Sequence, residues 1–170
     1  MTSRQRMLAA YKLLQPVRVP ISPEIWSATV FEYKKEPFFR YLGPFADKDF
    51  IEAWFETQQY FGCDPWILVG LDEPTEGENF KISKESYYLN PETIQTEVII
   101  NTCQGVLYEI SRTNREYDGW CIEHPVKNFL RDMPAYEQAT LTDPWSQEAN
   151  SINRALSIVG DNGLVSANLG

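Results

Sequence analysis

Cysteine and histidine are scarce in this sequence, and basic residues are too few to balance the acidic ones. The three cysteines, Cys63, Cys103 and Cys121, have neither the paired spacing of a zinc site nor the density of a disulfide scaffold. Fifteen Lys and Arg residues against 24 Asp and Glu residues give a net charge of -9. This balance argues against a nucleic-acid interface, which needs clustered cations. We therefore expect a reduced, cytoplasmic protein that binds no nucleic acid.

Long apolar runs are also absent. The longest, such as residues 66–70, fall far short of the about 20 residues that a membrane span needs. The basic N-terminus leads into a short amphipathic helix rather than the apolar block of a signal peptide. Hydrophobic residues make up 43% of the chain and aromatic residues 14%, which is enough for a sizeable core. We expect one folded domain without membrane contact.

The first part of the chain alternates helical patterns with short β-prone runs. A first helix is expected to begin at Thr2 or Ser3, with Gln5 completing a capping box, and to end at Pro16. Further helices are expected over 24–33 and from an Asp47 cap to Gly62. The runs at 17–22 and 65–70 are predicted to be strands, the second buried on both faces. A helix leading directly into such a run is the unit of a parallel sheet.

The pattern changes between about residues 87 and 127. Two β-prone runs, 96–101 and 106–111, flank Cys103-Gln104-Gly105 and predict a hairpin. Residues 120–122 are expected to add a third antiparallel strand, and a short helix follows from about Phe129. We interpret this stretch as an inserted antiparallel β-meander.

The alternation of helix and strand resumes near the end of the chain. Asp143 is expected to cap a helix with Pro144 at its first position, and Gly160 to end it. Residues 164–168 form the third predicted parallel strand. A closed (β/α)₈ barrel needs eight strands and about 250 residues. The layers therefore predict either the N-terminal part of an α/β barrel, incomplete at residue 170, or a small complete α+β domain.

Several segments carry a likeness to a known family, in the same order along the chain. They are residues 1–10 with 16–22, then Gly62-Cys63-Asp64 in a "GxD" pattern, and residues 101–107, similar to "TPxGxL" with Cys103 in place of the proline. Trp120 with 123–127 is similar to "W…EHPVK", and 159–163 resembles a helix end before a strand. Together they resemble the uroporphyrinogen decarboxylase superfamily, in its branch of corrinoid- and cobalamin-dependent methyltransferases. The resemblance implies that residues 1–170 are one partial TIM-barrel domain with an inserted β-meander.

The same resemblance implies a function. It points to methyl transfer between a corrinoid carrier and a thiol, or to demethylation of a small methylated compound. The substrate would be a small molecule and the partner of the full-length protein a corrinoid protein. Such enzymes hold zinc through a histidine and cysteines in the second half of the barrel, and no cysteine here has that spacing. We therefore expect no metal on this chain, and no activity from it alone.

Two other functions stay open. Decarboxylases of this family grip substrate carboxylates through an arginine-rich turn after the first strand. Residues 23–26 occupy that place here and contain Glu24 instead of an arginine, which disfavours a tetrapyrrole with eight carboxylates. A decarboxylase of another acid remains an alternative. The other is a non-catalytic binding or assembly module.

The expected site residues follow the predicted strands, because barrel active sites lie at the carboxyl ends of the strands. Asp72 and Glu73 follow the second strand, and Asn168 ends the third. We expect Asp72 to be catalytic and Glu73 and Asn168 to bind substrate. The alternative for Asp72 is a solvated turn before Pro74.

Three more residues complete the predicted site. Glu24 and Trp26 follow the first predicted strand and are expected to bind substrate. His124 is the only histidine and hence the only side chain with an ordinary titration near neutral pH, which favours an acid–base or ligand role. The alternatives are a first-turn helix position for Glu24, core packing for the tryptophan and a structural histidine.

Overall fold

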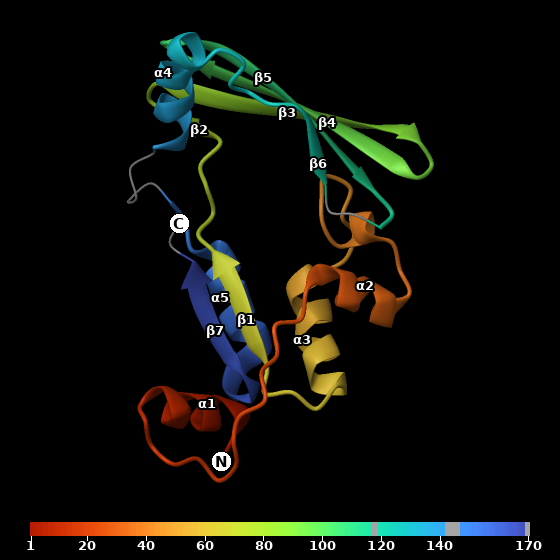
Figure 1. The fold of residues 1–170 in the computed structure, drawn as a ribbon, viewed down its shortest axis with the longest axis vertical. Helices are drawn as coiled ribbons and strands as arrows, with labels where there is room; N and C mark the ends of the chain where they lie inside the picture. Colours follow the sequence, from red (N-terminus) through yellow and green to blue (C-terminus); the bar gives the residue numbers. More distant parts are fainter. Residues whose placement is uncertain (117–118, 142–146, 169–170) are drawn as a thin grey trace. The chain divides into compact units, whose positions relative to one another are not determined.

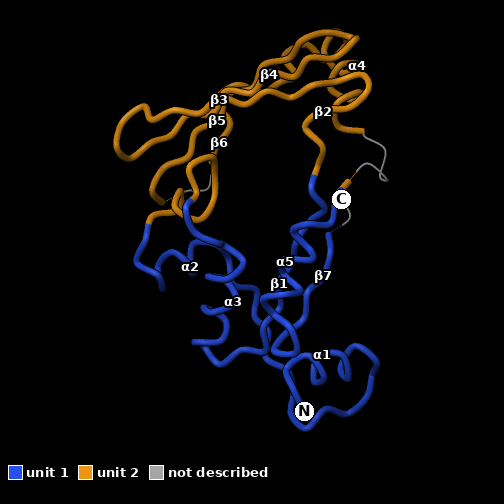
Figure 2. The backbone as a smooth tube through the Cα atoms, turned by 180° about the vertical axis from the view of Figure 1, so that it is seen from behind, with its two compact units in different colours: residues 1–36, 47–72, 148–170 blue, residues 37–46, 73–147 orange. Residues whose placement is uncertain are grey.

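The computed structural model describes residues 1–116, 119–141 and 147–168, and the chain divides into two compact units (Figures 1 and 2). Unit 1 is built from residues 1–36, 47–72 and 148–170, and unit 2 from residues 37–46 and 73–147. Unit 1 holds a two-stranded parallel sheet, and unit 2 holds a five-stranded antiparallel sheet. The fold is therefore mixed α/β. None of the described helices has the length and apolar character to cross a membrane.

Helix α1 (Ser3–Tyr11) opens unit 1 with the predicted capping box. The Thr2 hydroxyl accepts a hydrogen bond from the Gln5 amide, and the Gln5 side chain accepts one from the Thr2 amide. The prediction that Pro16 ends this helix is wrong, since the helix stops at Tyr11. Leu13 takes a left-handed backbone conformation two residues later, and the chain turns there.

The first predicted strand, residues 17–22, is not formed. Val17 and Val19 are exposed, and the backbone N–H of Ile21 donates to the Asp64 carboxylate rather than to a neighbouring strand. Pro20 has no N–H to contribute to a ladder. This segment is held by one carboxylate instead of by strand pairing, so the prediction of three parallel strands is wrong here.

Helices α2 (Ser27–Lys34) and α3 (Phe50–Tyr60) follow in unit 1. Helix α2 begins three residues later than expected. Asp49, not Asp47, caps α3, because its carboxylate accepts a hydrogen bond from the Glu52 amide at 2.7 Å. Gly62 was correctly expected to end α3, and its φ of 69° is a conformation that glycine adopts without steric cost.

Strands β1 (Trp66–Gly70) and β7 (Leu164–Asn168) form the parallel pair of unit 1, in register from Trp66 opposite Leu164 to Gly70 opposite Asn168. Helix α5 (Asn150–Val159) and the 3₁₀ turn η3 (Gly160–Asn162) precede β7, and Gly160 ends α5 as predicted. The expected cap at Asp143 and Pro144 lies outside the described residues.

The core of unit 1 lies between this strand pair and the helices α3 and α5. Its buried members are Phe55, Ile67, Ala155 and Val159. Leu68, whose side chain alternates with that of Ile67 along β1, is 42% exposed. The prediction that β1 is buried on both faces is therefore wrong for the described residues.

Gln58 joins α3 to β1 from a buried position. Its side-chain N–H donates to the Trp66 carbonyl at 3.0 Å, and its carbonyl accepts from the Trp66 amide at 2.8 Å. We expect Gln58→Met to lower the free energy of unfolding by about 1–3 kcal/mol, because both Trp66 backbone groups lose their partner without a loss of side-chain volume. Urea denaturation followed by circular dichroism measures this. Gln59→Met, at the exposed neighbouring position, is the control, and equal stability of the two variants would contradict the prediction.

Unit 2 is built around five antiparallel strands in sequence order: β2 (Glu76–Gly77), β3 (Phe80–Asn90), β4 (Thr93–Thr102), β5 (Gly105–Asn114) and β6 (Trp120–Glu123). The predicted hairpin around Cys103-Gln104-Gly105 and the third strand at 120–122 are confirmed. The sheet begins earlier than the predicted start at about residue 87, since β2 begins at Glu76 and β3 at Phe80. Strand β3 pairs with β4 along nearly its whole length. The short 3₁₀ helix η1 (Phe38–Arg40) also belongs to this unit.

Helix α4 (Phe129–Thr140) covers one face of this sheet, which confirms the helix expected from about Phe129. Asn128 caps it through a hydrogen bond from the Arg131 amide. The core of unit 2 lies between the helix and the sheet, and it consists of Ala135 and Ala139 from α4 with Val98, Ile100 and Leu107 from the strands. Each unit thus has its own sheet and its own core.

Candidate functional site

The carboxyl ends of the two parallel strands meet at one edge of the unit 1 sheet. Asn168 is the last residue of β7 and lies opposite Gly70, the last residue of β1. Asp72 follows β1 by two residues. Two of the predicted site residues, Asp72 and Asn168, therefore belong to the same strand edge, where α/β enzymes place their ligands.

Asp72 is held at this edge by the start of α5. Its carboxylate accepts hydrogen bonds from the Ser151 hydroxyl and from the Ser151 amide, the latter at 3.2 Å. Its backbone also pairs with that of Glu148 in an antiparallel bridge. Ser151 is the second residue of α5, so Asp72 satisfies a helix N-terminus from a distant part of the chain.

These contacts set the charge of Asp72. The hydrogen bond from the Ser151 hydroxyl, followed by the one from its amide, holds the pKa of this carboxyl below its usual value. Asp72 is therefore ionised at neutral pH. A carboxylate offers about four lone-pair sites, so Asp72 can still accept hydrogen bonds from a ligand. It is poorly suited to donate a proton.

A second carboxylate at this edge was missed in the sequence analysis. Glu148 precedes α5 and accepts a hydrogen bond from the Asn150 side chain. Its backbone reaches Asp72 across 76 positions of sequence (148 − 72). No local pattern around Glu148 distinguishes it from any other acid before a helix. Only the pairing of the two segments reveals its place.

Glu24 and Trp26 also belong to unit 1, but they do not lie at the end of a strand. The strand expected before them is absent, and both side chains are exposed. Trp26 is the N-cap residue of α2 and makes no side-chain capping bond. Glu24 lies outside that helix, so its expected alternative, a first-turn helical position, is wrong.

Glu73 and His124 belong to unit 2. Glu73 lies in the loop before β2, and His124 directly follows β6; both are exposed. Next to His124, Glu123 forms an ion pair with Lys127, four residues later. The predicted site residues are thus divided between the units, with Asp72, Asn168, Glu24 and Trp26 in one and Glu73 and His124 in the other.

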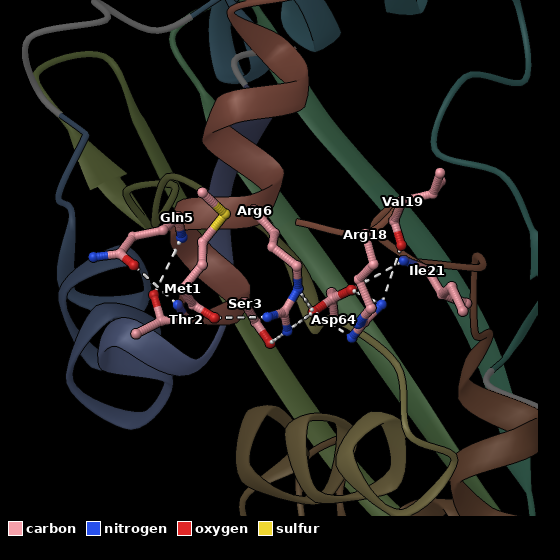
Figure 3. A network of polar contacts seen from close by, with 9 residues as sticks. All are labelled: Met1, Thr2, Ser3, Gln5, Arg6, Arg18, Val19, Ile21 and Asp64. Carbon is pink, nitrogen blue, oxygen red and sulfur yellow. Dashed lines mark hydrogen bonds and ion pairs between the residues drawn. The ribbon is translucent and has the colours of Figure 1, made fainter. Parts of the chain in front are cut away.

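Asp64 is the centre of a buried ionic network in unit 1 (Figure 3). Its carboxylate accepts hydrogen bonds from Arg6 at 3.0 and 2.5 Å, from Arg18 at 3.1 Å and from the Ile21 amide at 3.0 Å. Burial alone raises the pKa of Asp64, but the bonds from Arg6, Ile21 and Ser3 outweigh it and lower the pKa to about 2. This aspartate is a structural anchor that ties α1 and residues 18–21 to the start of β1.

The described residues offer no donor set for zinc. No group of three or more His, Cys, Asp or Glu side chains gathers in residues 1–116, 119–141 and 147–168 in a way that would hold a metal ion. Cys63 lies in unit 1, whereas Cys103 and Cys121 lie in unit 2. These residues do not fit a zinc site of the kind that the family resemblance implies, and we derive no zinc-dependent step from them.

The chain was compared with models of protein families, with curated proteins and with solved structures, and no match was found in any of the three comparisons.

Proposed function

We propose that this chain forms part of a barrel enzyme similar to uroporphyrinogen decarboxylase, from the methyltransferase-like branch. Its reaction would be methyl transfer between a corrinoid carrier and a thiol, or demethylation of a small methylated compound. The observation that supports this most is the Asp64 network. Three of the family-like segments contribute to it, through Arg6, through Arg18 with Ile21, and through Asp64 itself. In the proposal, these segments depend on one another in the fold.

The parallel pair β1–β7 supports the barrel part of the proposal. Each strand follows a helix, α3 before β1 and α5 before β7, and the core of unit 1 lies between these helices and the strands. This is the repeating arrangement of an α/β barrel. In the proposal the barrel includes further strands, and the edge with Asp72 and Asn168 forms part of the wall of its pocket.

Asp72 would bind and orient the substrate at this edge. Its carboxylate is ionised and fixed in place by Ser151, so it can accept a hydrogen bond from a substrate O–H or N–H or lie against a developing positive charge. Fixed carboxylates of this kind act mainly by positioning and electrostatics. His124 and Glu73, which belong to unit 2, stay predictions of the sequence and are not assigned to this edge. The proposal includes a reducing, cytoplasmic environment, which suits the three free cysteines.

The test is a comparison of the complete gene product with its Asp72→Asn variant. We expect the complete protein to consume methylcobalamin in the presence of a small thiol. Asp72→Asn should lower kcat/KM by roughly tenfold to a hundredfold, because a neutral amide replaces a charged hydrogen-bond acceptor. Steady-state kinetics measure this effect, and residues 1–170 alone should show no turnover.

A matched control is Glu92→Gln, which neutralises an exposed acid between β3 and β4 and should leave the rate unchanged. Release of carbon dioxide from a carboxylic acid substrate, without demethylation, would overturn methyl transfer in favour of decarboxylation. No turnover of either kind, together with a discrete, cooperatively melting oligomer in light scattering, would instead indicate an assembly module.

A further inference from the structure

Residues 1–23, called here the N-terminal segment, differ in charge from the rest of the chain. They contain Arg4, Arg6, Lys12 and Arg18 but no Asp or Glu, although the chain as a whole carries 24 acids and a net charge of -9. Residues 24–170 therefore hold all 24 acids. A segment of one sign within a protein of the opposite sign selects for partners of complementary charge.

The N-terminal segment also exposes an unusual number of large apolar side chains. Leu13 is 94% exposed, and five others in the segment are more than half exposed: Tyr11, Leu14, Val17, Val19 and Ile21. Single exposed apolar residues are normal on a protein surface. Here six lie within eleven residues of sequence, from 11 to 21, and exposed apolar side chains that gather on one surface mark interaction sites.

Leu13 is fixed in its exposed position by the backbone. Its φ is 56°, a left-handed conformation that favours glycine or asparagine. The turn is closed by hydrogen bonds from the Leu13 amide to Ala10 and from the Leu14 amide to Ala9, both to carbonyl oxygens. A leucine held there at a cost in backbone energy points to a role for its side chain outside the fold.

A cavity of about 350 Å³ lies beside these residues. It is lined by Met7, Ala10 and Tyr11 of α1 and by Pro20 and Ser22 of the returning chain. The lining is mostly apolar, and all of it belongs to unit 1. Its volume lies at the lower end of the range for ligand pockets, about 300–1,000 Å³, and suits a small apolar group.

The cations of the segment differ in how far they are already neutralised. Arg6 is mostly buried and bound to Asp64, and Arg4 lies 3.8 Å from Asp161. The side chain of Arg18 also contacts Asp64 but remains 44% exposed. Lys12 is exposed, and no ion pair of its ammonium group is found within the described residues. Arg4 is 43% exposed and its pair with Asp161 is loose, so Lys12, Arg4 and the exposed part of Arg18 are the charges that a partner would meet.

We propose that the N-terminal segment docks an acidic, apolar peptide segment of a partner protein. An apolar side chain of that peptide enters the cavity, and its carboxylates lie against Lys12 and Arg18. An anionic membrane is less favoured, because the cavity suits one inserted side chain rather than a broad lipid surface. A second copy of this surface would bring the same cations together. This inference does not depend on the proposed enzyme function.

The test uses an acetylated hexapeptide amide, Asp-Glu-Leu-Phe-Asp-Glu, titrated into the isotope-labelled chain and followed by NMR. We expect saturable chemical-shift changes that concentrate in residues 7–22. A peptide with lysines in place of the four acids should bind at least about fivefold more weakly, because its charges repel Lys12 and Arg18. Failure of the acidic peptide to bind, or equal binding of both peptides, would overturn the proposal.

Leu13→Gly separates binding from folding. Glycine suits the left-handed backbone, so this variant should melt no lower than the parent chain, while its affinity for the acidic peptide falls by about fivefold to tenfold. Leu130→Ala is the matched control, since Leu130 is 88% exposed on α4 of unit 2, and it should bind as the parent does. Two results would overturn the proposal and indicate a different binding partner for this surface. They are binding to phosphatidylglycerol vesicles without peptide binding, and self-association that Leu13→Gly abolishes.

Discussion

Asp64→Ala is expected to destabilise unit 1 by about 3 kcal/mol or more. The substitution leaves the guanidinium of Arg6, which is only 14% exposed, without its carboxylate, and it removes the partner of the Ile21 amide. Removing one member of a buried ion pair costs about 3–5 kcal/mol because the remaining charge stays desolvated. Urea denaturation, followed by circular dichroism, measures the loss. Residues 1–22 should also become sensitive to limited proteolysis, because Asp64 is the group that holds Arg6, Arg18 and Ile21 together.

Asp161→Ala is the matched control for this prediction. Asp161 also faces an arginine of α1, Arg4, but at 3.8 Å and with an 82% exposed side chain. Exposed pairs contribute about 0–1 kcal/mol, so this variant should unfold nearly as the parent does. Equal, small effects of Asp64→Ala and Asp161→Ala would contradict the view that the network is a buried anchor.

The same network predicts how stability changes with pH. The pKa of Asp64 is lowered to about 2 in the folded chain, whereas an unfolded aspartate titrates near about 3.9. A lowered folded-state pKa contributes stability that is fully present above the unfolded pKa and is lost as pH falls through the folded one. Asp64 should therefore stabilise the fold above about pH 4 and lose this contribution toward about pH 2. In Asp64→Asn, the difference in stability from the parent chain should shrink over the same interval.

Gly163→Ala is expected to lower the free energy of unfolding by about 2–3 kcal/mol. A Cβ at this position would lie 2.5 Å from the Pro65 carbonyl oxygen and 2.9 Å from a methyl group of Val159. The φ of Gly163 is -173°, which any residue adopts, so the cost is steric rather than conformational. The Pro65 oxygen also accepts the Leu164 amide at 2.8 Å. The chain must shift where β7 first pairs with β1, and overpacking of this kind costs about 1–3 kcal/mol.

Gly70→Ala is the control in the same strand pair. Nothing lies within 4 Å of a Cβ built at Gly70, and its φ is outside the left-handed range. This variant should be as stable as the parent chain or slightly more stable, because alanine reduces the freedom of the unfolded chain. Thermal melts measure both effects. Equal melting temperatures of Gly163→Ala and Gly70→Ala would contradict the prediction, because the close approach to Pro65 would then not constrain the fold.

Local signals in the sequence were enough to predict local structure. The capping box of Thr2 and Gln5, the hairpin around Gly105 and the helix end at Gly160 are all formed. Each depends on residues within a few positions of one another. The strand expected at 17–22 failed for the opposite reason. Its β-prone composition is local, but what determines its conformation is Asp64, more than forty positions away.

Strand β3 was not predicted, because its sequence does not look buried. It carries Lys81, Lys84 and Glu85 among its eleven residues, and most of its side chains are exposed. A strand that pairs with one long neighbour needs little apolar alternation to form, because β4 supplies its hydrogen bonds. Charged side chains on such a strand also limit unwanted edge pairing.

The candidate site shows the same division between local and distant causes. The apolar run that forms β1 and the turn residues after it were enough to predict that Asp72 follows the end of a strand. Its partners could not be predicted, since Ser151 lies 79 positions later and Glu148 lies before a helix that begins at a later residue than expected. Pairing across that distance depends on the folded arrangement of α5 and β1. The role of Asp72 as an acceptor, rather than a donor, of hydrogen bonds therefore emerged only from the structure.

The arrangement of unit 1 has a consequence for synthesis on the ribosome. Strand β1 is complete at residue 70, but its only described neighbour, β7, begins at residue 164. Throughout the translation of unit 2, Ile67 and the apolar face of α3 have neither β7 nor α5 to cover them. The β3–β4–β5 pairing of unit 2, in contrast, closes within a short stretch of chain. The nascent chain thus carries a strand without its partner for about ninety residues of elongation, and its apolar face is open to non-native contacts during that time.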